Sequence, residues 1–310
     1  MAPNLFVSFL KETIRMSAFD QYFQNIYGDR WPKIRSALLQ EPQQVLYKNP
    51  FTENIPTRFN DFEIWSPGAW LKKPENPFTP ERDEQGLLDA YVLDPASVFV
   101  GEAVGVQDGE KVLDMCAAPG GKSLVMSGAL KTSGLLVSND ISNDRRLRMK
   151  KMLDQYLPES AKARSSVCGF DGIQYGLKTA AQFDRVLLDA PCSGERHFME
   201  NASEVDAWKP KKSENLAQRQ YALLCAALLA VKPGGIVVYS TCSINPKEND
   251  KVIERLLHKK SDQFQIVSLS PPRFAEKTEY GVQFLPDACG FGPMYCCKIQ
   301  KHESLPSNRT

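Results

Sequence analysis

The chain has few of the residues that build metal centres or disulfide frameworks. Its 310 residues include three histidines and eight cysteines, and no two cysteines form a C-x-x-C pair. Because zinc sites usually need such spacings, we expect no bound metal. A chain of this length with 42% hydrophobic residues can build an ordinary core, so we expect the cysteines to be reduced thiols.

An excess of one charge and long apolar runs are also missing. The net charge is +1, so a surface that binds nucleic acid has to be a local patch. No apolar run is long enough to span a bilayer, so we expect no membrane partner. Residues 1–16 lack the pattern of a secretory signal, and Glu12 and the small number of arginines argue against a targeting helix, which stays an alternative. We therefore expect a cytoplasmic protein, with a mitochondrial location as the alternative.

The character of the sequence changes along the chain. Aromatic residues recur at helical spacing between Phe19 and Tyr27, and we expect helices from residue 1 to about residue 48. Residues 49–86 are rich in proline, asparagine and aromatics without periodicity, which indicates a long ordered loop. We expect a helical N-terminal extension and loop over 1–86, a second domain over 87–301 and a polar tail over 302–310.

From residue 87, short apolar runs alternate with helical patterns. The runs lie at 112–115, 135–138, 165–168, 185–189, 235–240 and 264–268, and the helical segments lie at 119–130, 142–156, 213–231 and 247–259. Strands without polar alternation, separated by helices, predict a doubly wound α/β domain with a mostly parallel sheet. A last run at 293–299 follows without a helix, so we expect it to add an antiparallel strand.

The first predicted strand leads directly into a turn of small residues and then a helix. The turn consists of Cys116, Ala117, Ala118, Pro119, Gly120, Gly121 and Lys122. It matches neither the dinucleotide fingerprint nor the P-loop. Small residues let a ligand approach the backbone, and the N–H groups at a helix start favour an anion. On these residues alone, an ordinary strand-to-helix turn is an equal alternative.

Acidic residues follow three successive predicted strands. Asp140 follows the second strand, Asp171 and Gly172 follow the third, and Asp189 ends the fourth. Ligands of open α/β sheets bind beyond the carboxyl ends of the strands, where a carboxylate suits ribose hydroxyls. A single acid at such a place is often only a helix cap. Three of them favour a ligand that contains a nucleoside.

Two cysteines lie just past strand ends at the same predicted edge. Cys192 follows VLLDAP and Cys242 follows VVYST, and both lie among polar residues where a thiol is reachable. A thiolate that adds to carbon 6 of cytosine makes carbon 5 electron-rich, so that it accepts a methyl group from a sulfonium. An acid such as Asp189 is suited to hold the edge of the ring at nitrogen 3. One cysteine suffices for attack and a second can assist release, and the chemistry alone does not decide which is which.

Four segments together resemble a known family. LDMCAAPGGKS, LLDAPCSGER, KPGGIVVYSTCSINPKEND and FGPMYCCKI are similar to segments of the Sun/Nop family of S-adenosylmethionine-dependent RNA cytosine-C5 methyltransferases. The resemblance covers about Tyr91 to Lys301. It implies a Rossmann-like class I methyltransferase domain over 87–301 with S-adenosyl-L-methionine as cofactor. It also implies that Cys242 is the nucleophile, that Cys192 assists release and that Asp189 positions the base.

The resemblance further assigns a cofactor site and a substrate. The cofactor-binding residues that it implies are Cys116, Ala117, Ala118, Pro119, Gly120, Gly121, Lys122, Asp140, Arg145, Asp171, Gly172 and Asp189. The chain is similar to the compact ribosomal-RNA branch, so the implied partners are RNA, ribosomal RNA or a ribosomal particle in particular, and a protein that assists targeting. Many members have an Arg-rich stretch after the proline–cysteine motif, whereas Lys209, Lys211 and Lys212 come later here.

Two other functions remain open on the sequence. The enzyme could act on transfer RNA, or the protein could be a ribosome-assembly factor whose binding matters more than methyl transfer. Smaller expectations concern single residues: His197 as a base beside Cys192, and Glu248 and Asn249 as helix caps. The segment with Trp65, Trp70, Lys72 and Lys73 could contact RNA or pack on the domain.

Overall fold

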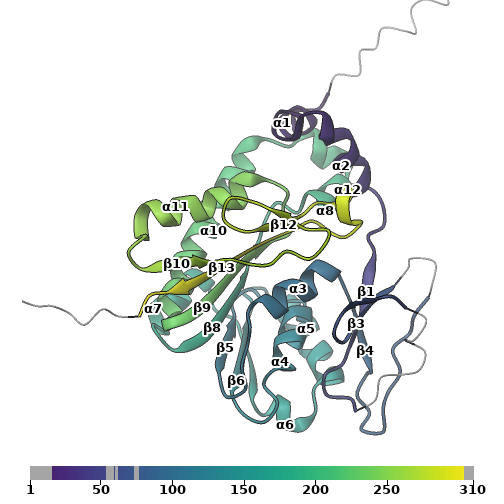
Figure 1. Cartoon of the computed structure of the whole chain (residues 1–310), viewed down its shortest axis with the longest axis vertical. Helices are drawn as coiled ribbons and strands as arrows, with labels where there is room; N and C mark the ends of the chain where they lie inside the picture. Colours follow the sequence, from purple (N-terminus) through teal and green to yellow (C-terminus); the bar gives the residue numbers. More distant parts are fainter. Residues whose placement is uncertain (1–15, 54–58, 60–61, 73–76, 304–310) are drawn as a thin grey trace, which may run out of the picture.

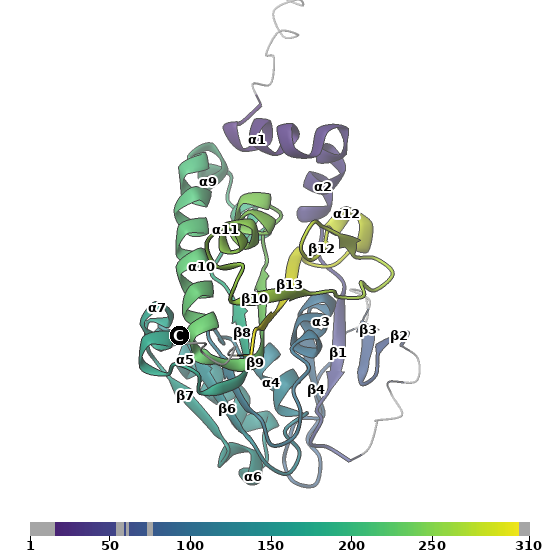
Figure 2. The ribbon, with the colours of Figure 1, turned by 60° about the vertical axis from the view of Figure 1, so that its left-hand side comes forward.

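The computed structural model describes residues 16–53, 59, 62–72 and 77–303 (Figure 1). A large mixed sheet forms the middle of the molecule, with helices on both of its faces (Figure 2). Expectations for residues 1–15, for Lys73 and for residues 304–310 concern positions outside these ranges. No helix in the described ranges is both long and apolar enough to cross a bilayer.

The parallel part of the large sheet consists of strands that the sequence predicts. These are β5 (Lys111–Asp114), β6 (Leu135–Asn139), β7 (Ser165–Cys168), β8 (Phe183–Asp189) and β9 (Val231–Thr241). They pair in the order β7-β6-β5-β8-β9, so the direction in which strands are added reverses between β5 and β8. The doubly wound α/β fold is thereby confirmed. Ligands of such sheets bind at this reversal, beyond the carboxyl ends of the strands.

The C-terminal strands extend the sheet in antiparallel fashion. They are β10 (Phe264–Val267), β11 (Glu276–Lys277), β12 (Val282–Phe284) and β13 (Met294–Lys301). β13 pairs antiparallel with β9, which confirms the expectation for residues 293–299. The expectation that β10 belongs to the parallel series is wrong, because β10 pairs antiparallel with β13. Since β13 occupies the free edge of β9, β10 can reach only the far edge of β13.

Helices cover the two faces of the sheet because the strand residues alternate between two cores. Leu187 of β8 packs into one core and its neighbour Leu188 into the other. The helices of the first face are α3 (Pro95–Ala103), α4 (Gly121–Ser127), α5 (Asn143–Tyr156) and α6 (Glu159–Lys162). Those of the second are α7 (Gly172–Lys178), α10 (Pro210–Ala230) and α11 (Asp250–Lys260).

The N-terminal helices pack against the segment that follows β8. α1 (Ala18–Tyr27) and α2 (Trp31–Leu38) are joined by the 3-10 turn η2 (Gly28–Arg30). Their aromatic residues meet those near α8 (Glu195–Met199) and α9 (Ala202–Asp206), and the ring centroids of Phe19 and Trp208 lie 5.6 Å apart. The remaining short helices are η4 (Pro246–Glu248) and α12 (Pro286–Cys289). The extension therefore braces the loops at the carboxyl edge of the sheet.

A small antiparallel sheet lies where the sequence indicates helix and loop. Its strands are β1 (Gln44–Lys48), β2 (Ile64–Ser66), β3 (Ala69–Lys72) and β4 (Ala90–Leu93), in the order β2-β3-β1-β4. The expectation of helix up to residue 48 and of loop through 64–72 is therefore wrong. Strands of three to five residues are too short to display a period of two. Trp70 is 7% exposed and packs on Phe59. Its ring is therefore part of the packing of the small sheet.

We expect Gly176→Ala to destabilise the protein through the contact between α7 and α10. A Cβ at this position would lie 2.2 Å from the carbonyl oxygen of Ala226 and 2.8 Å from its Cα, and these backbone atoms cannot turn away. Overpacking of this kind costs about 1–3 kcal/mol. Leu177→Ala on the same helix is the control, because that side chain is 75% exposed. Denaturant unfolding measures both variants, and equal stabilities would contradict the packing described.

Candidate active site

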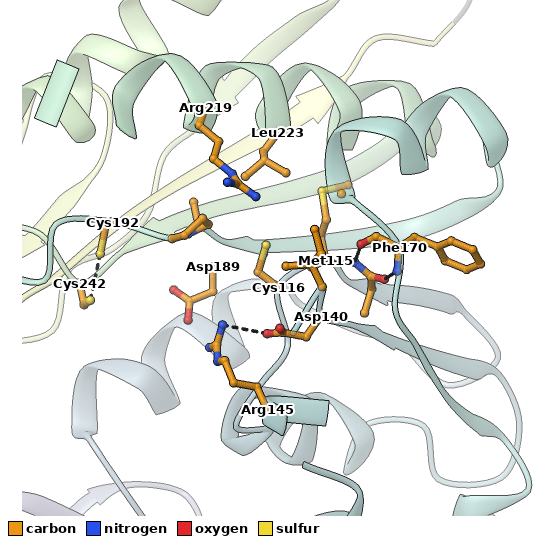
Figure 3. A pocket seen from close by; sticks show the side chains of 15 residues that line it. Met115, Cys116, Asp140, Arg145, Phe170, Asp189, Cys192, Arg219, Leu223 and Cys242 are labelled. Atoms are coloured by element: carbon orange, nitrogen blue, oxygen red, sulfur yellow. Dashed lines mark hydrogen bonds and ion pairs between the residues drawn. The ribbon is translucent and has the colours of Figure 1, made fainter. Parts of the chain in front are cut away.

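A cavity of about 310 Å³ lies at the carboxyl ends of β5, β6, β8 and β9 (Figure 3). Seven residues singled out in the sequence line it, namely Cys116, Asp140, Arg145, Gly172, Asp189, Cys192 and Cys242. A second cavity of about 120 Å³ adjoins it and shares Cys116 and Asp189. It is lined also by Ala117, Ala118, Pro119, Gly121 and Lys122. The fold thus brings together residues that lie up to 126 positions apart in the chain.

The two glycines of the turn after β5 pack closely against neighbouring side chains. Gly120 has a φ of 110°, and a Cβ there would lie 2.3 Å from Cε of Met152. A Cβ on Gly121 would lie 2.7 Å from Cδ1 of Leu93. The positive φ of Gly120 favours glycine there, and a side chain at either position would require Met152 or Leu93 to move. Gly120 itself lines neither cavity.

Asp140 connects the turn after β5 with the helix after β6. Its carboxylate accepts a hydrogen bond from the backbone N–H of Ala118 at 3.3 Å and pairs with the Arg145 guanidinium at 2.9 Å. Arg145 also donates to the carbonyl oxygen of Ala118. Asn139 adds a second link, since its amide group donates to Met115 and Phe170 and accepts from the N–H of Phe170. These bonds hold three strand ends around the larger cavity.

Asp189 lies where the two cavities meet, between a lysine and a hydroxyl. Its Oδ2 lies 2.8 Å from Nζ of Lys122, and its Oδ1 accepts a 2.8 Å hydrogen bond from Ser240. Burial opposes the charge on Lys122, but the carboxylate of Asp189 outweighs this and raises the lysine pKa. Lys122 therefore stays protonated, and the pair offers both a cation and a carboxylate to one ligand.

Cys192 and Cys242 converge at one end of the larger cavity. Their sulfurs lie 3.0 Å apart although fifty residues separate them in the chain (Figure 3). The Cys242 side chain is exposed, whereas Cys192 is only partly exposed. The hydrogen bond to Cys242, together with burial, raises the pKa of Cys192 well above its usual value. Cys192 therefore retains its proton next to an accessible second thiol.

Some residues expected in the site have other tasks. The Asp171 carboxylate caps α7 by accepting from the N–H of Ile173 and lies outside both cavity linings. His197 is directed to solvent, where it pairs with Glu200 at 2.9 Å. Glu248 and Asn249 do not cap α11 with their side chains. Asn249 instead bonds Thr241 and Gln283, and Glu248 accepts from the backbone N–H of Ser193.

Several residues that line the larger cavity carry no signal in the sequence. Met115, Phe170 and Leu223 supply apolar surface, and Arg219 of α10 extends toward it (Figure 3). No local pattern distinguishes Arg219 from other surface arginines, since only the packing of α10 beside β8 brings it to the opening. The part of the chain that the structure describes has no cluster of His, Cys, Asp and Glu arranged to hold a metal ion.

The strand order and the cavity at the point of reversal are those of a Rossmann-like α/β methyltransferase fold, and a pair of cysteines lines this cavity. A family described as 16S rRNA methyltransferase RsmB/F matches residues 102–300. The chain belongs to this family, which confirms the resemblance to the Sun/Nop RNA cytosine-C5 methyltransferases.

Individual relatives agree with this placement. The chain is 30% identical to the 5-cytosine rRNA methyltransferase NSUN4 of Bos taurus, over 92% of this chain and 88% of the relative. It is 29% identical to the mitochondrial tRNA (cytosine(34)-C(5))-methyltransferase of Mus musculus, over 92% and 90% of the two chains. A crystal structure of a methyltransferase homolog from Pyrococcus horikoshii is 25% identical, with a TM-score of 0.74 over 91% and 93%.

One buried acid beside the site has only half of its hydrogen-bonding capacity satisfied. Oδ2 of Asp114 accepts a 2.7 Å hydrogen bond from Ser123, while Oδ1 has no partner within the described residues. Burial raises the Asp114 pKa to about 7, because the charged form is poorly solvated there. Asp114 also lines the smaller cavity.

We expect the free energy of unfolding to fall with pH because of Asp114. Below pH 3.8 the Asp114 carboxyl is protonated in both the folded and the unfolded protein. Between pH 3.8 and about 7 the unfolded chain releases this proton while the folded protein retains it, so the free energy of unfolding falls as the pH rises. Above pH 7 both states have lost the proton, and the free energy of unfolding no longer changes because of Asp114. In Asp114→Asn the free energy of unfolding should lack this pH-dependent decrease, which amounts to about a few kcal/mol in the wild type. Denaturant unfolding across this window measures it, with Asp144→Asn on exposed α5 as the charge control. An unchanged pH dependence in Asp114→Asn would contradict the assignment.

Proposed function

We propose that this protein transfers a methyl group from S-adenosyl-L-methionine to carbon 5 of a cytosine in RNA, and that Cys242 bonds covalently to the base during the reaction. Membership of the RsmB/F family supports the reaction class. The observation that carries the mechanism is the 3.0 Å approach of the two sulfurs beside the cavity at the strand ends. Two thiols at one cavity suit a reaction that forms and then breaks a bond to sulfur.

The residues around the two cavities fit S-adenosyl-L-methionine, which supplies an electrophilic methyl group on its sulfonium when bound. Asp140 is placed to hold ribose hydroxyls, and Gly172 leaves room beside the apolar Phe170. The residues Cys116–Pro119 and Gly121 line the smaller cavity together with Asp114, whose unpartnered Oδ1 is suited to an ammonium group. Arg145 orients Asp140, and Asp171 supports Gly172 by capping α7.

The chain's residues divide the work on the base between them. The Sγ of Cys242 adds to carbon 6 of the cytosine, and the electron density that reaches carbon 5 allows that carbon to accept the methyl group. A base then takes the proton from carbon 5, the bond between sulfur and carbon 6 breaks, and Cys242 leaves as a thiolate. The raised pKa of Cys192 leaves a protonated thiol 3.0 Å away, and we propose that it assists this release.

Asp189 and Lys122 are proposed to hold the edge of the base. The ring must be unstacked from the RNA to expose its face, so its polar edge needs new hydrogen-bond partners. The Asp189 carboxylate can accept from the exocyclic amine or from a protonated nitrogen 3, and protonated Lys122 can donate to the carbonyl oxygen of the base. Proton donation toward nitrogen 3 makes carbon 6 more electrophilic. Asp189 is therefore proposed to position the base, and as an acceptor it stabilises the form of the base that is protonated at nitrogen 3.

We expect Cys242→Ala to lower methyl transfer by at least about a thousandfold, since the nucleophile is lost. Cys192→Ala should instead let a covalent RNA adduct accumulate, visible as a band shift that survives denaturant. Cys225→Ala, which alters a cysteine outside both cavities, serves as the control. An adduct that forms with Cys242→Ala and not with Cys192→Ala would reverse the two roles. Absence of an adduct in both would contradict covalent catalysis.

Ribosomal RNA is the proposed substrate, and transfer RNA is the second candidate. The NSUN4 relative is named an rRNA methyltransferase, whereas the Mus musculus relative is named a tRNA methyltransferase at nearly the same identity and coverage. The family description, 16S rRNA methyltransferase, favours ribosomal RNA. We propose residues 87–301 as the catalytic domain and residues 1–86 as an extension that supports it.

We expect one 5-methylcytosine in ribosomal RNA to disappear when the gene is deleted, because the proposed enzyme would recognise its target cytosine within one RNA structure. Bisulfite or mass-spectrometric mapping of rRNA and tRNA measures this. Wild-type protein should restore the modification and Cys242→Ala should not. Loss of a tRNA modification with rRNA unchanged would favour the second candidate. Full rescue of growth by Cys242→Ala would favour the assembly factor.

The partner and the compartment depend on the substrate. A ribosomal particle or an accessory protein would supply RNA contacts that a chain of +1 net charge provides only locally. The mitochondrial alternative gains support from the name of the Mus musculus relative, and the cytoplasm remains the other candidate. Imaging of the tagged protein, together with the compartment of the affected RNA, distinguishes the two.

A further inference from the structure

Each of the two cysteines is followed by a serine, and the two serines meet a pair of buried glutamates. Ser193 and Ser243 face Glu195 of α8 and Glu248 of η4, and we call these four side chains the Ser–Glu cluster. The Oγ of Ser193 lies 2.6 Å from Oε1 of Glu248 and also contacts Oε1 of Glu195. The Oγ of Ser243 lies 2.9 Å from the same oxygen of Glu195. Glu195 and Glu248 are 1% and 0% exposed.

The hydrogen atoms of the two serines cannot account for these contacts. Four oxygen–oxygen contacts join the cluster, one of them at 3.2 Å between the two serine hydroxyls. The three contacts between a serine and a glutamate are closer, and each of these needs one hydrogen between its two oxygens. A serine hydroxyl carries one hydrogen, so Ser193 and Ser243 supply two. The third has to come from a carboxyl group that donates to Ser193. At least one of the two glutamates is therefore protonated in this arrangement.

The surroundings of the cluster stabilise one negative charge and oppose a second. Backbone N–H groups of Ser193 and Ile244 and the amide group of Gln220 donate to the carboxyl groups. No lysine or arginine in the described ranges forms an ion pair with either glutamate. The titratable groups that face the cluster are Tyr27 of α1, Tyr239 of β9 and Cys192, and each is neutral or negative. Uncompensated buried charges are costly, so the second glutamate retains its proton.

We infer that Glu195 and Glu248 share one proton and that this singly protonated pair is a positioning device that holds Cys192 and Cys242 together. The inference rests on the proposed role of Cys242. Ser193 and Ser243 are adjacent in sequence to the reacting thiols, so the cluster ties the loop after β8 to the loop after β9. Neither glutamate lines the cavity, and both act through the serines.

The state of the pair affects the thiols through its charge. Burial and the charge of Glu248 raise the pKa of Glu195 to about 7. Above this pH the pair carries a second negative charge directly behind the cysteines, and both glutamates already raise the pKa of Cys192. A further charge opposes formation of a thiolate nearby. The proton on the pair therefore favours both the geometry and the reactivity of the cysteines.

Glu195→Gln tests this, because the amide has the shape of the protonated acid and cannot ionise. The measurement is the rate at which iodoacetamide alkylates each of the two cysteines, Cys192 and Cys242, at neutral and alkaline pH. Peptide mass spectrometry monitors the two cysteines separately, and the experiment needs no RNA and no cofactor. Above pH 7 we expect alkylation in Glu195→Gln to be faster than in the wild type by up to about tenfold, the factor that one pKa unit represents. Glu214→Gln, an exposed acid outside the cluster, should match the wild type.

Two further measurements separate positioning from mere folding. The alkaline limb of the kcat profile should move to higher pH in Glu195→Gln, and the infrared band of a protonated carboxyl at neutral pH should lose intensity. Identical alkylation profiles in Glu195→Gln and wild type would overturn the inference even if Cys242 is the nucleophile. Failure of both Glu195→Gln and Glu248→Gln to fold would overturn it too, since replacing a protonated carboxyl by an amide preserves its shape.

Discussion

The parallel pairing of β8 with β9 is the constraint on which the site depends. In its register Leu188 lies beside Tyr239 and Asp189 beside Ser240, so both strands end at the same level. Only two or three further residues on each side then bring Cys192 and Cys242 within 3.0 Å. A shift of one residue would direct Asp189 to the opposite face of the sheet and separate it from Lys122. The hydrogen bond from Ser240 to Asp189 reinforces the correct register.

Several buried or partly buried carboxyl groups lie at the same edge of the sheet, and each of them is stabilised differently. Asp189 pairs with Lys122, and Asp140 pairs with Arg145. Asp114 has no cation at hydrogen-bonding distance among the described residues, and burial raises its pKa to about 7. Such arrangements limit the negative charge around a thiol that has to become a nucleophile. One oxygen of Asp114, which lines the smaller cavity, has no hydrogen-bond partner within the described residues.

The larger part of the fold was predictable because its strands are buried on both faces. Such strands are continuous apolar runs, and the runs at 112–115, 135–138, 165–168, 185–189 and 235–240 all became strands of the parallel sheet. The small sheet was missed because its strands are three to five residues long. The prediction for β10 was wrong because strand pairing depends on which edge of the sheet is free. β13 occupies the free edge of β9, so β10 pairs with β13 instead.

The sequence by itself determined the kind of chemistry, since the glycine turn, the acids after the strands and the two cysteines are local features. Only the tertiary structure decided how these features combine. It brought the sulfurs together, put Asp171 to use as a helix cap, directed His197 to solvent and turned Glu248 toward Ser193. The reason is physical: helical and strand periodicities specify which face of an element is buried. Neighbours distant in sequence are set by strand order and helix packing, which no local pattern contains.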